Sequence, residues 1–68
     1  MTNTNELKSA IMRKGLTIKS LAAQMGISTG TLSRKINGKR EFRASEMLIL
    51  AEVLGLTGEE INYIFFCQ

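Results

Sequence analysis

Residues 17–38 constrain the fold of this 68-residue chain more than any other stretch, because two short helical patterns flank one glycine there. Thr17 can cap a first helix, and Gly26 falls where helices commonly end in a left-handed conformation. Ser28 can cap a second helix that follows at once. The stretch therefore predicts two helices joined by a tight turn, at residues 17–25 and 28–37.

The apolar positions of this stretch indicate how its two helices pack. Ala22 lies four residues before the glycine, where two helices that cross steeply over a short turn leave little room for a side chain. A larger residue at this position is expected to clash. The other apolar residues recur at helical spacing and should face a common core: Leu21, Met25, Ile27, Leu32 and Ile36.

Caps and glycine stops divide the rest of the chain into three further helices. Asn3 or Thr4 can cap the first, and Thr57 with a glutamate three positions on forms the reciprocal capping box of the last. The start of the helix between them is left open, because Arg43 is a poor cap and Ser45 a good one. We expect an all-α fold without a strand, with five helices at 4–14, 17–25, 28–37, 44–54 and 58–66.

Length and composition favour one small domain over residues 1–68, near the lower size limit for a fold held by a hydrophobic core alone. Cys67 is the only cysteine and histidine is absent, so neither an internal disulfide nor a usual zinc spacing is possible. We expect no metal and no cofactor. The longest apolar stretch, 47–56, is short and contains a glutamate, so we expect a cytoplasmic protein with no membrane contact.

Charge is distributed unevenly along the chain. Residues 1–43 hold all nine basic residues against two glutamates, a net charge of +7, whereas residues 44–68 hold four glutamates and no base, a net charge of −4. A basic half and an acidic remainder would turn one face of the protein toward a polyanion. The alternative is that these charges only solvate the surface.

The residues of the 17–38 stretch resemble the helix-turn-helix of the phage repressor and Cro family, also called XRE-type regulators. The resemblance extends from about residue 5 to residue 66 and implies a compact, lambda-repressor-like domain. Two family features are replaced, a glutamine by Ile18 and a Trp-Glu pair by Lys35-Ile36, so no phosphate contact is assigned to Ile18. The resemblance rests on four groups: Leu21-Ala22, Gly26-Ile27-Ser28, Leu32-Ser33 and Asn37-Gly38.

The resemblance implies that the second helix of the motif enters the major groove of double-stranded DNA, N-terminal end foremost. Arg34 lies opposite the apolar face of that helix, and its guanidinium can donate two hydrogen bonds to one guanine. Gly30 has no side chain to read with, so it either permits close approach to the DNA or is unread. The expected base-reading residues are Ser28, Thr29, Gly30 and Arg34.

A second group of polar residues around the motif is expected to bind DNA phosphates, which fixes register without choosing sequence. Several of them lie in the loop after the motif, where Phe42 is expected to plug into the core and anchor the loop. The expected phosphate-binding residues are Lys19, Ser33, Lys35, Asn37, Lys39, Arg40 and Arg43.

The last predicted helix carries apolar residues on more than one face. Ile61, Ile64 and Phe65 form the stripe expected to close the core, which leaves Tyr63 and Phe66. Large exposed aromatic residues commonly mark a contact surface, so we expect Tyr63 and Phe66 to form a homodimer interface. The alternative is that so small a domain buries both of them.

These observations favour a sequence-specific transcriptional regulator of the Cro or repressor type, which binds a palindromic operator as a dimer in a bacterial or phage-infected cell. An enzyme would need a nucleophile with a base, or paired acids, yet only Cys67 and scattered glutamates are present. We therefore expect neither catalysis nor a small-molecule substrate. The alternative is an antitoxin-like helical module that binds a protein partner and contacts DNA secondarily.

Overall fold

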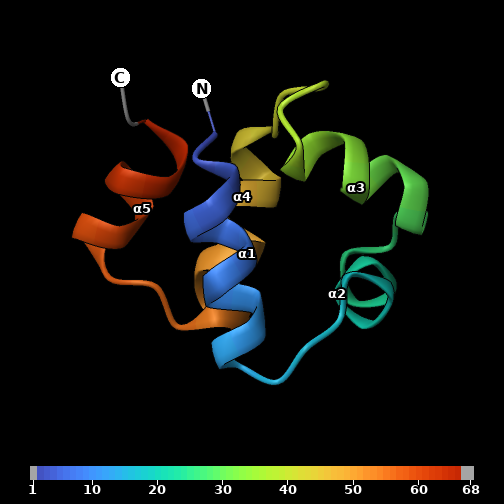
Figure 1. Ribbon diagram of the computed structural model, residues 1–68, viewed down its shortest axis with the longest axis horizontal. Helices are drawn as coiled ribbons and strands as arrows, with labels where there is room; N and C mark the ends of the chain where they lie inside the picture. Colours follow the sequence, from blue (N-terminus) through green and yellow to red (C-terminus); the bar gives the residue numbers. More distant parts are fainter. Residues whose placement is uncertain (1, 67–68) are drawn as a thin grey trace.

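The computed structural model describes residues 2–66 and consists of five helices, none of them long and apolar enough to cross a membrane (Figure 1). The helices are α1 (Thr4–Arg13), α2 (Ile18–Met25), α3 (Thr29–Ile36), α4 (Ala44–Leu54) and α5 (Gly58–Phe65). No strand occurs within the described residues. The all-α prediction is confirmed, and each predicted helix end lies within one residue of the observed one. Cys67 lies outside the described residues.

Side-chain caps begin four of the helices, as their sequences predict. Asn3 caps α1 by accepting the Glu6 N–H at 3.2 Å, which settles the choice between Asn3 and Thr4. The Thr57 hydroxyl accepts the Glu60 N–H at 3.1 Å, while the Glu60 carboxylate accepts the Thr57 N–H at 2.9 Å. These bonds satisfy backbone donors that have no partner within the helix, and so fix where each helix starts.

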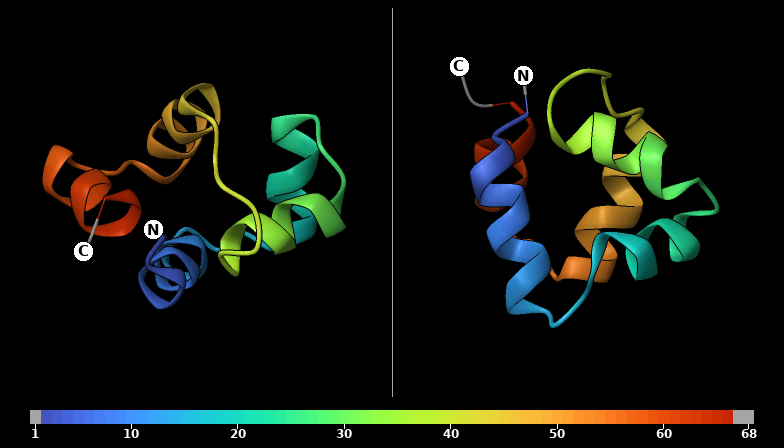
Figure 2. Two further views of the ribbon diagram at one scale, coloured as in Figure 1. Left: turned by 90° about the horizontal axis from the view of Figure 1, so that it is seen from above. Right: turned by 45° about the vertical axis from the view of Figure 1, so that its right-hand side comes forward.

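Gly26 makes the turn between α2 and α3. Its φ of 71° is left-handed, a conformation that costs a residue with a Cβ about 1–2 kcal/mol. The turn lets the Ile27 N–H bond back to the Ala22 carbonyl at 3.1 Å. The chain therefore reverses within a few residues, and α3 crosses α2 at close range (Figure 2).

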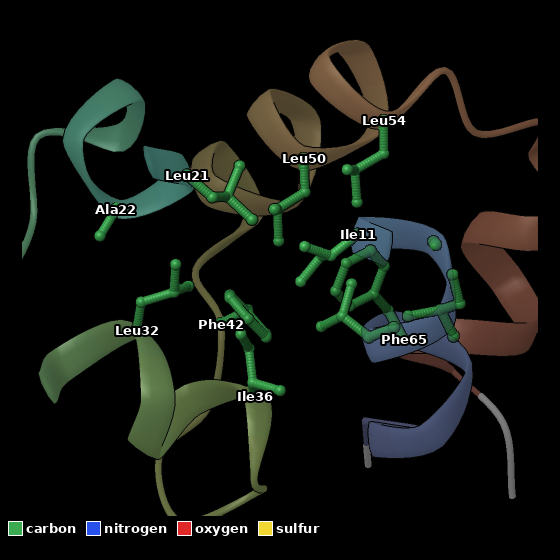
Figure 3. Packing of buried hydrophobic residues seen from close by; sticks show 12 residues of the cluster. Ile11, Leu21, Ala22, Leu32, Ile36, Phe42, Leu50, Leu54 and Phe65 are labelled. Atoms are coloured by element: carbon green, nitrogen blue, oxygen red, sulfur yellow. The ribbon is translucent and has the colours of Figure 1, made fainter. Parts of the chain in front are cut away.

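The core is built around a close approach of α2 to α3 and an aromatic pair. Ala22 is 1% exposed, as expected for a small residue at a close helix crossing. Phe42 is buried and meets Phe65 edge to face with ring centroids 5.5 Å apart, so its predicted role as a loop anchor is confirmed (Figure 3). The buried apolar residues are Leu7, Ala10, Ile11, Leu21, Ala22, Leu32, Ile36, Phe42, Leu50, Leu54, Ile64 and Phe65.

The N-terminal end of α1 joins the ends of two other helices. The Asn3 N–H donates to the Ile64 carbonyl at 2.6 Å, and the Thr4 hydroxyl donates to the Ile36 carbonyl at 2.7 Å. Both acceptors lie in the last turn of a helix, where carbonyls lack a partner within the helix. As a result α1 lies between α5 on one side and the α2 and α3 pair on the other (Figures 1 and 2).

Because α2 and α3 cross closely, we predict that the same substitution at two neighbouring alanines has very different effects on stability. Ala22→Leu should lower the free energy of unfolding by about 1–3 kcal/mol, because the added atoms must push the two helices apart. Ala23→Leu, at an exposed position of the same helix, should change it by no more than about 0.5 kcal/mol. Urea unfolding followed by circular dichroism measures both, and equal effects would contradict the close crossing.

Candidate nucleic-acid interface

The exposed face of α3 lies opposite its buried residues. Leu32 and Ile36 are fully buried against the core, whereas Thr29, Gly30 and Arg34 are exposed. The helix periodicity therefore places the predicted base-reading residues on one surface, at the N-terminal end and middle of the helix. Their contact with bases remains a prediction.

The Ser28 hydroxyl is already engaged within the protein. It accepts the Thr31 N–H at 3.1 Å and donates to the Thr31 hydroxyl at 2.8 Å, so it caps α3. A base edge would have to compete with these bonds. Thr31, which the sequence did not single out, fixes the orientation of this hydroxyl.

Arg34 and Gly30 form one feature of the α3 surface. A Cβ built on Gly30 would lie 3.6 Å from Nη1 and 3.9 Å from Nη2 of Arg34, so the guanidinium folds back along α3 toward its N-terminal end. These distances are ordinary van der Waals contact, and a side chain larger than alanine would displace the guanidinium. Gly30 thus leaves open the space in which the Arg34 guanidinium lies.

The loop after α3 presents cations from an anchored backbone. The Lys39 N–H bonds to the Arg34 carbonyl at 2.9 Å, and Phe42 fills the core at the other end of the loop. Lys39, Arg40 and Arg43 are exposed on this loop. Three further predicted phosphate ligands lie elsewhere on the motif, with Lys19 and Asn37 exposed and Ser33 half-buried.

Lys35 departs from the sequence prediction. It is only 6% exposed, and its Nζ donates to both carboxylate oxygens of Glu46 at 2.6 Å. The side chain therefore points away from the exposed face of α3, and its charge is already paired. The expectation that Lys35 binds phosphate is corrected: it belongs to the interior contact between α3 and α4.

Glu46 joins this ion pair to the start of α4. Its Oε1 also accepts the Arg43 N–H at 2.8 Å, and this bond begins α4, where the Arg43 side chain provides no cap. Burial raises the pKa of Glu46, but the hydrogen bonds from Lys35 and from the Arg43 N–H outweigh it, so the pKa lies below its ordinary value of 4.5.

The signal for this pair was present in the sequence but weak. Residues 32, 35 and 36 share one helix face, which places Lys35 beside the apolar anchors. Glu46 stands three positions after Arg43, as the glutamate of a capping box does. No local sequence pattern links Lys35 to Glu46, which lies eleven residues further along the chain.

The predicted dimer residues are exposed on α5. Tyr63 and Phe66 are each 54% exposed, whereas Ile64 and Phe65 are buried and Ile61 is partly buried against the core. The predicted division of the α5 aromatics and aliphatics is therefore confirmed, and the alternative that all are buried is wrong. Whether Tyr63 and Phe66 meet a second copy stays a prediction.

Comparison with known protein families matches a helix-turn-helix family model to residues 7–61, which covers all of α2, the turn and α3. The chain belongs to the XRE helix-turn-helix family. The family resemblance inferred from the sequence is thus confirmed. Comparisons with curated proteins and with solved structures gave no significant match.

Membership of the XRE family makes the chain a DNA-binding transcription regulator. The family is a DNA-binding regulatory domain and is generally non-enzymatic. The exposed face of α3 and the cationic loop after it carry most of the residues for which the sequence predicts base or phosphate contacts.

The low pKa of Glu46 predicts how the stability of this XRE domain depends on pH. Because the folded state lowers this pKa, Glu46 contributes stability that is present above pH 4.5 and is lost as the pH falls through the folded value. Wild type should therefore lose stability in acid more steeply than the Lys35→Met/Glu46→Gln double variant. Glu60, whose pKa is lowered chiefly by the Thr57 N–H, adds an acid-sensitive contribution that both proteins share.

Urea unfolding at several pH values between about 7 and 3 measures this difference. Parallel pH profiles for wild type and the double variant would show that the Glu46 carboxylate is not held by the contacts described.

Proposed function

We propose that this XRE-type regulator binds a palindromic operator as a homodimer, in the manner of Cro and repressor proteins, and reads base edges with the exposed face of α3. The observation that carries the proposal is the Arg34 guanidinium, which is exposed opposite Leu32 and Ile36 and lies over a residue without a side chain. An arginine on the outward face of a helix can reach the base edges in the major groove.

The base-reading roles follow from position on α3. Arg34 donates two hydrogen bonds to the O6 and N7 of one guanine, the commonest specific contact in the major groove. Thr29 lies at the N-terminal end of the helix, where its hydroxyl or methyl group touches a neighbouring base. Gly30 leaves room for the Arg34 guanidinium, and Ser28 contributes chiefly by holding the helix end through its bonds to Thr31.

The phosphate-binding roles fall to polar residues around α3, all of them exposed except the half-buried Ser33. The anchored loop holds three cations at the C-terminal end of α3, and Lys19 lies in the first turn of α2. Cations on both sides of the reading helix would fix its register on the two DNA backbones. The proposed phosphate-binding residues are Lys19, Ser33, Asn37, Lys39, Arg40 and Arg43.

The proposed dimer uses the side of the molecule away from the motif. Tyr63 and Phe66 are exposed, and α5 lies across α1 from the α2 and α3 pair (Figure 1). The domain measures 27 × 24 × 20 Å, and a two-fold dimer of it must place its α3 helices in successive major grooves, about 34 Å apart. One recognition helix reads too few base pairs to select a site in a genome, which favours such pairing.

The proposal covers the chain as a single domain, residues 1–68, acting on the nucleoid in the cytoplasm of a bacterial or phage-infected cell, without catalysis, cofactor or small-molecule ligand. An antitoxin-like module is the second candidate. It is favoured by large apolar side chains exposed outside α5, Met12 at 73% and Leu48 at 71%, which a protein partner could cover.

Selection of bound sites from random DNA duplexes tests the proposed function and the role of Arg34. Wild type should recover a palindrome whose half-sites lie one helical turn apart, about 10 base pairs. Arg34→Ala should lose the preference at one base pair of each half-site. Lys39→Ala should recover the same site with lower affinity for all DNA and a salt slope reduced by about 0.9 per protomer.

The outcomes of the selection separate the candidates. If Arg34→Ala selects the same base as wild type at every position of the site, Arg34 does not read a base. If wild type selects no site, the result would contradict the proposed function and favour the antitoxin-like alternative.

The dimer interface is tested by a Tyr63→Ala/Phe66→Ala double variant. Because both side chains are largely exposed, helical content should be retained while cooperative binding to the full palindrome is lost and binding to one half-site persists. Met12→Ala/Leu48→Ala removes two apolar side chains outside α5 that are even more exposed, and it serves as the control. Gel-shift titration of full and half sites measures both, and a two-fold complex of unchanged affinity in the first variant would place the interface elsewhere.

A further inference from the structure

The last turn of α3 is held by two polar contacts in addition to its apolar face. Lys35 Nζ lies 2.6 Å from both oxygens of Glu46, and the Thr4 hydroxyl donates to the Ile36 carbonyl at 2.7 Å. Apolar contacts are non-directional and allow helices to slide or rotate slightly. A charge-assisted hydrogen bond to both oxygens of one carboxylate has a preferred geometry, so it restricts such motion.

Glu46 fixes the loop after α3 at both of its ends. Lys35 precedes the loop, and the Arg43 N–H, which bonds the same Oε1 at 2.8 Å, closes it. Between these points lie the exposed cations of the loop, and Arg34 immediately precedes Lys35 in the chain. One carboxylate therefore sets the position of the reading side chain relative to the phosphate-binding loop.

Stability alone is a weak explanation for this ion pair. The Lys35 and Glu46 side chains are only 7% and 13% exposed, so both charges have lost most of their hydration. Replacing a buried ion pair by uncharged residues of similar volume is often neutral or stabilising, because the desolvation cost offsets the attraction. Uncharged residues would not reproduce the geometry that the ion pair imposes.

We infer that Lys35 and Glu46 are positioning residues for sequence recognition, which hold Arg34 and the loop cations in the one arrangement that fits base edge and phosphates together. The inference rests on the proposed reading role of α3. Neither side chain touches DNA: Lys35 is turned to the interior, and its charge is balanced by Glu46. Their loss should lower the preference for the correct site without weakening general attraction to DNA.

The Lys35→Met/Glu46→Gln double variant tests the inference. It leaves no buried charge unpaired and keeps the net charge of the protein, and the introduced amide can still accept the Arg43 N–H. Lys35→Met/Glu46→Met, which replaces the pair with two unbranched apolar side chains, is measured in parallel so that the result does not depend on one packing solution. The control is Lys8→Met/Glu52→Gln, which makes the same charge changes at two exposed positions.

Affinity is measured for the duplex selected by wild type and for a random duplex, at several salt concentrations, with circular dichroism and urea unfolding to establish that each variant is folded. In both interior variants the ratio of the two affinities should fall at least fivefold, since discrimination at one base pair is worth roughly 5- to 150-fold. The random-duplex affinity and the salt slope should stay as in wild type. The control should retain both the ratio and the slope.

Three results would overturn the inference. An unchanged affinity ratio in a folded interior variant would leave the pair a structural contact only. Equal losses on both duplexes, with the salt slope lowered by about 0.9 per protomer, would return Lys35 to the phosphate-binding set. Unfolding of both interior variants would show that the pair is needed for the fold itself. Failure of wild type to select any site would instead refute the proposed function, so the two failures are distinguishable.

Discussion

The close crossing of α2 and α3 is the constraint on which the rest of the structure depends. It requires a residue as small as Ala22 at the contact and a left-handed glycine at position 26, since any larger side chain or ordinary turn would separate the helices. Once α3 is held against α2, its periodicity decides the rest: Leu32 and Ile36 enter the core, and Arg34 faces outward. The orientation of α3, the proposed reading helix, is thus a consequence of the packing behind it.

The helices of this protein were predictable because their limits are set locally. The Thr57 capping box and the Gly26 stop each involve residues within about one turn of each other, and such patterns can be recognised in sequence. The start of α4 was not settled in this way, because its first backbone donor bonds to the Glu46 side chain and the Arg43 side chain provides no cap. The cap there is supplied by a residue inside the helix.

The outline of the candidate site was predictable from the sequence, but the role predicted for Lys35 was wrong. A lysine that follows Arg34 and precedes the loop cations is naturally interpreted as a phosphate ligand, and the position of Glu46, on another helix, shows otherwise. A similar limit applies to α4, where the apolar residues recur at helical spacing but only Leu50 and Leu54 are buried, while Met47 and Ala51 are partly covered. A domain of this size has too little chain to cover every apolar face, and its tertiary arrangement decides which are left.

The net charge of residues 1–43 is not the charge that the folded protein presents to DNA. Of its nine basic residues, Lys35 is neutralised in the interior, and Arg13 lies 3.6 Å from Glu60, where it links α1 to α5. Lys8 and Lys14 lie on α1 or directly after it, and the other exposed cations lie on α2, on α3 and in the loop after α3: Lys19, Arg34, Lys39, Arg40 and Arg43. What favours DNA binding is therefore their position around Arg34 more than the net charge of the sequence, because a charge steers a polyanion only from the face that it occupies. Glu59, in the first turn of α5, adds to this asymmetry, since α5 lies across α1 from the motif (Figure 1) and a negative charge there disfavours DNA on that side.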